Sequence, residues 1–161
     1  MTILKILKYP DKRLNIIAKP IKNINNKIKN LIFNMLNTMY AYNGIGLSAT
    51  QINKHLRIFV MDISKTYNQP IIIVNPKYNF VSNKYKKFKE GCLSIPYYFE
   101  YIYRSININL NAIDINGNNI IINAYGLISQ CIQHEIDHLN GKLLIDHLSQ
   151  QKKKKIYKIK D

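Results

Sequence analysis

The sequence is short of cysteine, of acidic residues and of long apolar stretches, and each shortage excludes a class of protein. Two cysteines are too few for a disulfide framework. They fit a reducing compartment, where a thiolate is free to bind a metal ion. No apolar run approaches the roughly 18 to 20 residues that a bilayer crossing needs, and lysines interrupt the apolar start of the chain before a signal-type core forms. We therefore expect a cytoplasmic protein with no membrane span.

The balance of charge is strongly basic, because 24 lysines and arginines face only 9 acidic residues and leave a net charge of +15. Such a charge favours a polyanionic partner, either RNA or an acidic membrane surface. However, nearly all of it is lysine, scattered among many asparagines, isoleucines and tyrosines. These four residue types have A/T-rich codons, so genome composition explains much of the bias. Basicity alone is weak evidence for a binding surface.

The first half of the chain predicts one helix and two strands in a single domain. Apolar residues recur at helical spacing over 28–40, with Asn25 or Asn26 as the cap. The small residues that follow favour a loop or a tight backbone passage over regular structure. Strand-like runs span 57–62 and 70–75, and Asn75-Pro76 should end the second one. The lysine-rich segment 81–89 is typical of a solvated hairpin or loop.

The second half predicts an antiparallel hairpin followed by a helix. Apolar residues alternate over 106–110, and the phase slips at Ala112-Ile113, which predicts a bulge before the turn at Asn116-Gly117 and a return strand over 120–122. After Ala124 the period changes to about 3.6 residues. The expected fold is α+β, with antiparallel sheets packed around a central buried helix.

That helix carries the pattern His-Glu-x-x-His, and Gly141 stands where a glycine commonly ends a helix. Residues four apart lie on one face of a helix, so His134 and His138 can offer ring nitrogens to a single metal ion. Glu135 would stand beside the ion as a general base. The pattern therefore predicts a catalytic metal site.

A catalytic tetrahedral site needs a third protein ligand and one open position for water. Cys131 is on the same helix but seven residues from His138, roughly 10.5 Å along the axis, which is too far for a short side chain. Cys92 follows a glycine and can reach the helix from a neighbouring strand, so it is the better choice. Cys131 is interpreted as a small apolar core residue.

Three segments in this order resemble the peptide deformylase family: 44–51 (GIGLSATQ), 90–94 (EGCLS) and 133–138 (QHEIDH). The resemblance continues through 8–14, 75–76 and 141–146, so it covers nearly the whole chain. It implies a catalytic domain over 1–149 and a basic C-terminal tail over 150–161 that is helical or frayed.

The resemblance implies a hydrolase that removes the formyl group from the N-terminal formylmethionine of new polypeptides. The family uses one divalent metal ion, commonly Fe(II), and Zn, Ni or Co also suit a site of this composition. Carried over residue by residue, the roles are metal ligands Cys92, His134 and His138, acid/base Glu135, and an oxyanion site made by the Gln51 amide and the Leu93 backbone N–H. The resemblance further implies nascent chains as the partner, weak ribosome contact through the basic tail, and a monomer.

Residues around this centre are expected to hold the substrate and the ligands. Ile45, Gly46 and Leu127 are assigned to the substrate, with Leu127 lining the methionine pocket. Glu90, two residues from Cys92, should orient either Gln51 or a histidine.

Near the end of the helix, Asp137 opposes the helix dipole and should need a cation. We predict Arg104 as its partner.

The chain departs from the family pattern in three places. Ser48 replaces the usual alanine, a small change from which little effect is expected. Residues 97–100 (YYFE) stand where the family has an acidic residue and then an arginine, which affects how downstream substrate residues are held. Gln130 lies where the family is usually apolar, so it either relaxes preference at the first substrate residue or points to solvent.

Two other functions compete with this interpretation. A zinc metallopeptidase of the His-Glu-x-x-His type would need a third ligand downstream of the helix, from Asp146, His147 or Asp161. A non-catalytic, basic, ribosome-associated binding protein would rest on charge alone.

Overall fold

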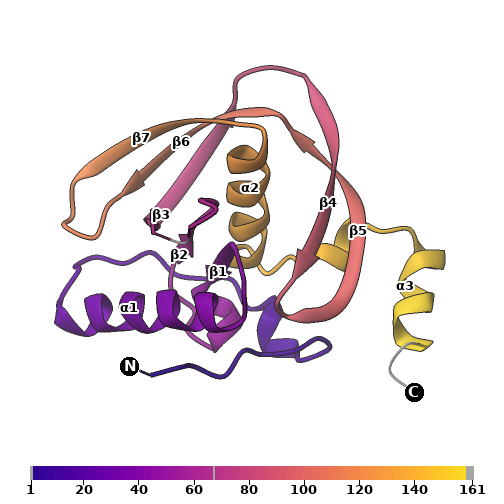
Figure 1. Ribbon diagram of the computed structural model, residues 1–161, viewed down its shortest axis with the longest axis horizontal. Helices are drawn as coiled ribbons and strands as arrows, with labels where there is room; N and C mark the ends of the chain where they lie inside the picture. Colours follow the sequence, from indigo (N-terminus) through magenta and orange to yellow (C-terminus); the bar gives the residue numbers. More distant parts are fainter. Residues whose placement is uncertain (1, 67, 159–161) are drawn as a thin grey trace.

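A computed structural model describes residues 2–66 and 68–158 (Figure 1). The helices are the 3-10 helices η1 (Lys12–Asn15), η2 (Ala49–Ile52) and η3 (Leu144–His147), and the α-helices α1 (Asn26–Ala41), α2 (Leu127–Leu139) and α3 (Gln150–Lys158). The strands are β1 (Gly46–Ser48), β2 (Ile58–Met61), β3 (Ile71–Phe80), β4 (Tyr85–Cys92), β5 (Ile95–Ser105), β6 (Asn107–Ile113) and β7 (Asn119–Tyr125).

The strands form two antiparallel sheets with α2 between them. One sheet has five strands in the order β1-β2-β3-β6-β7, and the other is the β4-β5 hairpin. Figure 1 shows α2 standing between the sheets, with α1 along the base of the molecule and α3 beyond β5. The predicted α+β class with a central helix is confirmed. None of the helices in the described part of the chain has the length and apolar character that a bilayer crossing needs.

Helix α1 forms where its apolar spacing predicts it. The Asn25 side chain accepts a hydrogen bond from the Ile28 N–H at 3.1 Å, which satisfies one of the unpaired donors of the first turn. Its buried face packs with strands β1 to β3 in one apolar cluster. Helix α2 packs in a second apolar cluster with strands of the same sheet, through Ile132, Ile136 and Leu139.

The end of α2 is set by Gly141, as predicted. Gly141 has a φ of 74°, and its N–H donates to the His138 carbonyl at 3.1 Å. The Lys142 N–H donates to the Asp137 carbonyl at 2.9 Å, which completes a Schellman motif. The last turn of α2, which carries His138, is therefore closed by hydrogen bonds.

Strand β3 contradicts the prediction that Asn75-Pro76 ends it, because the strand continues to Phe80. The register shifts between Val74 and Lys77, and Asn75 has a φ of 52°. A bulge leaves residues out of the ladder, so Pro76 costs no strand-pairing hydrogen bond there. The Asn75 side chain holds the bulge by bonding the Ile21 N–H and carbonyl, each at 2.8 Å.

Two other local predictions were wrong. The bulge expected at Ala112-Ile113 is absent, since β6 pairs with β7 in one unbroken register. Ala112 faces the α2 side of the sheet, while Ile113 packs against the cluster on the opposite face. The expected loop 44–51 contains β1 and η2. The segment 81–89, predicted as a solvated hairpin or loop, contains the largely exposed start of β4 and so belongs to a hairpin. Pairing with the strand that follows, which the residue pattern within each segment does not encode, decided these segments.

Candidate active site

The structure brings together the sulfur of Cys92 and a ring nitrogen from each of His134 and His138. The three donor atoms lie within 4.8 Å of one another. Both histidines project from one face of α2, and Cys92 arrives from the end of β4, where the register with β5 shifts after Gly91. The Cys92 Sγ is 3.2 Å from His138 Nε2. This set of one thiolate and two imidazoles suits a divalent transition metal.

Electrostatics prepare the Cys92 sulfur to bind a cation. Burial alone would raise the pKa of the thiol, but the charges and hydrogen bonds of His138 and His134 hold it well below its usual value. A thiolate, rather than a thiol, is the form that ligates metal.

Glu90 fixes the orientation of His134. Its Oε2 lies 2.9 Å from His134 Nδ1, which directs the other ring nitrogen toward Cys92. Glu90 is itself paired with Arg104 through contacts of 2.8 and 3.0 Å. Although burial opposes ionisation, His134 and Arg104 hold the pKa of Glu90 at about 2. Of the two predicted contacts, Glu90 therefore makes the one with a histidine.

Arg104 also reaches Asp137, with Nη1 and Oδ2 separated by 2.6 Å, so the predicted ion pair is confirmed. Asp137 has a second partner, His147, whose Nε2 lies 2.7 Å from Oδ2. Burial would raise the pKa of Asp137, but His147 and Arg104 together hold it below its usual value.

Glu135 lines the cavity beside Ser48. From the sequence, little effect was expected of a serine at position 48. The Ser48 hydroxyl is 2.6 Å from Glu135 Oε2 and 2.9 Å from the Glu135 carbonyl, and both residues are buried. Burial raises the pKa of Glu135, while nearby histidines and Ser48 act in the opposite direction. A carboxyl group with a raised pKa can both accept and return a proton near neutral pH.

The side chain of Gln51 is oriented by the short helix η2. The Ser48 N–H donates to Gln51 Oε1 at 2.9 Å, which turns the amide nitrogen toward the cluster. Gln51 Nε2 lies 3.1 Å from Ser94 Oγ and 3.6 Å from Cys92 Sγ. The neighbouring Leu93 carbonyl accepts from Lys8 Nζ at 2.5 Å.

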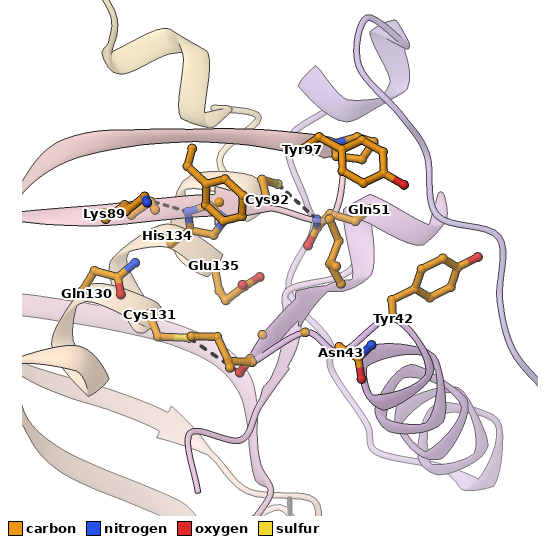
Figure 2. Close-up of a pocket in the computed structure, with 18 of the residues that line it drawn as sticks. Tyr42, Asn43, Gln51, Lys89, Cys92, Tyr97, Gln130, Cys131, His134 and Glu135 are labelled. Carbon is orange, nitrogen blue, oxygen red and sulfur yellow. Dashed lines mark hydrogen bonds and ion pairs between the residues drawn. The ribbon is translucent and has the colours of Figure 1, made fainter. Parts of the chain in front are cut away.

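A cavity of about 520 Å³ opens over these groups. Figure 2 shows Cys92, Gln51, His134 and Glu135 gathered at its inner end. The three residues assigned to the substrate, Ile45, Gly46 and Leu127, all line it. Gln130 also lines it and is only 6% exposed, so the alternative that it points to solvent is wrong.

The mouth of the cavity holds residues that the sequence had not singled out as a group. Tyr97 is 98% exposed and stands on the rim with Phe99, where the chain departs from the family pattern. Lys8 and Lys89 lie over the rings of Tyr42 and Phe99 respectively. The family-like segment 8–14 could have identified Lys8 as a residue of the site. Lys89 is identified only from the pairing of β4 with β5, which places it at the cavity.

Comparisons with known proteins agree with this geometry. Residues 3–154 match the family model described as polypeptide deformylase. A peptide deformylase of Azotobacter vinelandii is 46% identical over 98% of this chain and 94% of its own length. The crystal structure of peptide deformylase from Ehrlichia chaffeensis in complex with actinonin superposes with a TM-score of 0.94 at 41% identity, covering 99% of this chain and 97% of that one. A peptide deformylase from Legionella pneumophila gives a TM-score of 0.91 at 42% identity, covering 99% and 96%.

The chain belongs to the peptide deformylase family. It is therefore a hydrolase that removes the formyl group from the N-terminus of new polypeptides. The non-catalytic binding protein is thereby excluded.

The family assignment also excludes the zinc metallopeptidase, and the described geometry agrees with it. Cys92 joins the two histidines, while His147 pairs with Asp137 and the Asp146 carboxylate accepts from the Leu143 N–H. Asp161, the remaining alternative ligand, lies outside the described residues.

Proposed function

We propose that this deformylase holds one divalent metal ion through Cys92, His134 and His138, and that the ion is Fe(II). Support comes from the approach of the three donor atoms to within 4.8 Å and from the low pKa of the Cys92 thiol. Iron follows from the family resemblance, and Zn, Ni and Co fit the same donors. An ion held by three protein ligands would keep a position open for water.

Bound there, the ion would act as a Lewis acid that lowers the pKa of water and polarises the formyl carbonyl. Glu135 takes the proton as water attacks the formyl carbon, and then returns it to the leaving amine. The Gln51 amide and the Leu93 N–H donate to the oxygen on which negative charge develops. Losing one such donor typically costs about 10² to 10³ in rate.

The substrate enters as an extended chain beside β1, where Ile45 and Gly46 line the cavity. The methionine side chain lies against Leu127. Nascent polypeptides carry this group in the cytoplasm, so we assign the enzyme to that compartment as a monomer with a catalytic domain over 1–149. The basic tail 150–161, of which α3 is the described part, would make weak contact with the ribosome.

The observation that carries this proposal is the Cys92–His134–His138 cluster, and its test combines metal content with turnover. The protein is purified anaerobically, and bound metal and the rate on a formyl-Met-Ala-Ser peptide are measured in the same sample. We expect about one equivalent of iron and rapid turnover. Cys92→Ala should lose both, whereas the matched variant Cys131→Ala should keep its metal. Metal retained in Cys92→Ala would contradict the assignment.

A further inference from the structure

Gln130 places an amide that has no partner among the described residues on the wall of the substrate cavity. Its side chain is only 6% exposed, and it lies on the first turns of α2 next to Leu127 and Cys131, which line the same cavity. Across residues 2–66 and 68–158, no group hydrogen-bonds to this amide, which is open to the cavity. Figure 2 shows its polar end directed into the space in front of His134 and Glu135.

A second buried amide on α2 differs from Gln130 because the protein satisfies its hydrogen bonds. Gln133, three residues further on, is also buried, and its Nε2 donates to the Ser105 carbonyl at 2.8 Å and to the Ser129 carbonyl at 3.1 Å. Its Oε1 accepts from the Ser105 N–H at 3.2 Å. The Gln130 amide, by contrast, faces the cavity, where a bound ligand can pair with it.

We infer that Gln130 pairs with a polar first side chain of the substrate, and that this side chain is methionine sulfoxide. The inference rests on the proposed function, in which the first residue is formylmethionine beside Leu127. Oxidation of methionine adds one oxygen to the sulfur and keeps the length of the side chain. The sulfoxide oxygen is an acceptor without a hydrogen to donate, and Gln130 Nε2 is a donor that no described residue pairs.

Chains whose first methionine has been oxidised are therefore substrates of this enzyme. An entirely apolar pocket wall would leave the sulfoxide oxygen desolvated and unpaired, and would discriminate against it. With Gln130 in the wall, the cavity accepts both forms of the residue.

The test compares formyl-Met-Ala-Ser with the same peptide carrying methionine sulfoxide, and includes norleucine as an apolar reference. We expect wild-type kcat/KM for the sulfoxide peptide to lie within about threefold of that for methionine. Gln130→Leu keeps the size and helix propensity of the residue but removes the donor. In this variant the sulfoxide-to-methionine ratio should fall about tenfold or more, the equivalent of one lost hydrogen bond. The norleucine-to-methionine ratio should stay constant.

The same exchange at an exposed position, Gln150→Leu on α3, is the matched control and should keep the wild-type ratio. Equal sulfoxide-to-methionine ratios in wild type and Gln130→Leu would overturn the inference, as would rejection of the sulfoxide peptide by the wild type. Because each ratio uses methionine turnover as its own reference, these outcomes are separate from the test of deformylase activity. Circular dichroism and the melting temperature establish that Gln130→Leu is folded.

Discussion

At the scale of single residues, Ser48 connects two groups of the active site. Its hydroxyl holds the Glu135 carboxylate at 2.6 Å, while its N–H holds the Gln51 amide oxygen at 2.9 Å. One residue thus sets the positions of the acid/base and of an oxyanion donor. A hydrogen bond to a carboxylate favours the ionised form, so Ser48 keeps more of Glu135 ready to accept a proton.

Replacing Ser48 by alanine should impair the enzyme most at acidic pH. Burial already raises the pKa of Glu135, and the Ser48 hydrogen bond opposes that rise. Without the hydroxyl the pKa rises further, and the acidic limb of the kcat/KM profile moves to higher pH. We expect a loss of about fivefold on the acidic side, which shrinks as pH increases. The profile is measured on a formyl-Met peptide.

Ser149→Ala, remote from the cavity, is the control for this measurement. An acidic limb at the same pH in Ser48→Ala and in this control would contradict the role given to Ser48.

Spacing along the chain revealed those site residues whose relation is local, whereas the roles of Cys92 and Gln51 came with the family resemblance. His134 and His138 are four apart on a helix that their neighbours predict, so their common face followed from spacing alone. The contact of Ser48 with Glu135 spans 87 positions, and no periodicity encodes it. For the same reason the lack of a partner for Gln130 became visible only in three dimensions.

At the scale of elements, β1 places Gly46, a residue without a side chain, directly against Glu135. A Cβ on Gly46 would lie 2.4 Å from Glu135 Oε1 and 3.2 Å from Cys131 Sγ. Both neighbours are buried and packed, so neither has free space into which to move. A Cβ on Gly44 would lie 2.7 Å from the Cδ1 of Leu93, the end of a flexible side chain.

Gly46→Ala should therefore displace the Glu135 carboxylate and lower kcat by about 10². Gly44→Ala, the matched control, should lose less than about tenfold, since the tip of Leu93 can rotate away. Rates on a formyl-Met peptide and circular dichroism of both variants distinguish loss of geometry from loss of folding. A Gly46→Ala enzyme as active as Gly44→Ala would refute this explanation.

The type of an element was predictable where apolar residues recurred regularly over a long segment. Its end was predictable where a capping residue was present. Asn25 and Gly141 marked helix ends correctly because each acts on the backbone beside it. β3 ran past Pro76 because pairing with β6 beyond the bulge stabilises it, and the paired residues lie 28 to 34 positions apart. Local propensity yields to such pairing.

At the scale of the whole molecule, Arg104 ties the β4-β5 hairpin to α2. It lies on β5, pairs with Glu90 on β4 and reaches Asp137 on α2. The Arg104 side chain is 5% exposed, and the Glu90 side chain is fully buried. Removing one partner from a buried ion pair leaves the other charge without compensation.

Arg104→Met should consequently lower the free energy of unfolding by about 3 to 5 kcal/mol. The control is Lys152→Ala, which breaks the pair with Glu100 but removes a side chain that is 51% exposed. Exposed pairs contribute about 0 to 1 kcal/mol, so this variant should unfold close to wild type. Chemical denaturation of metal-loaded protein measures both, and equal stabilities would argue against a structural role for Arg104.

The distances in sequence between the contacting residues also bear on when the enzyme becomes active as it is made. Cys92 meets His138 across 46 positions and Ser48 meets Glu135 across 87. Contacts so far apart close large loops, which is slow relative to the formation of a single helix. During synthesis, β1 and the β4-β5 hairpin leave the ribosome before α2 exists to join them. Each new copy is therefore inert until α2 has emerged and packed between the two sheets.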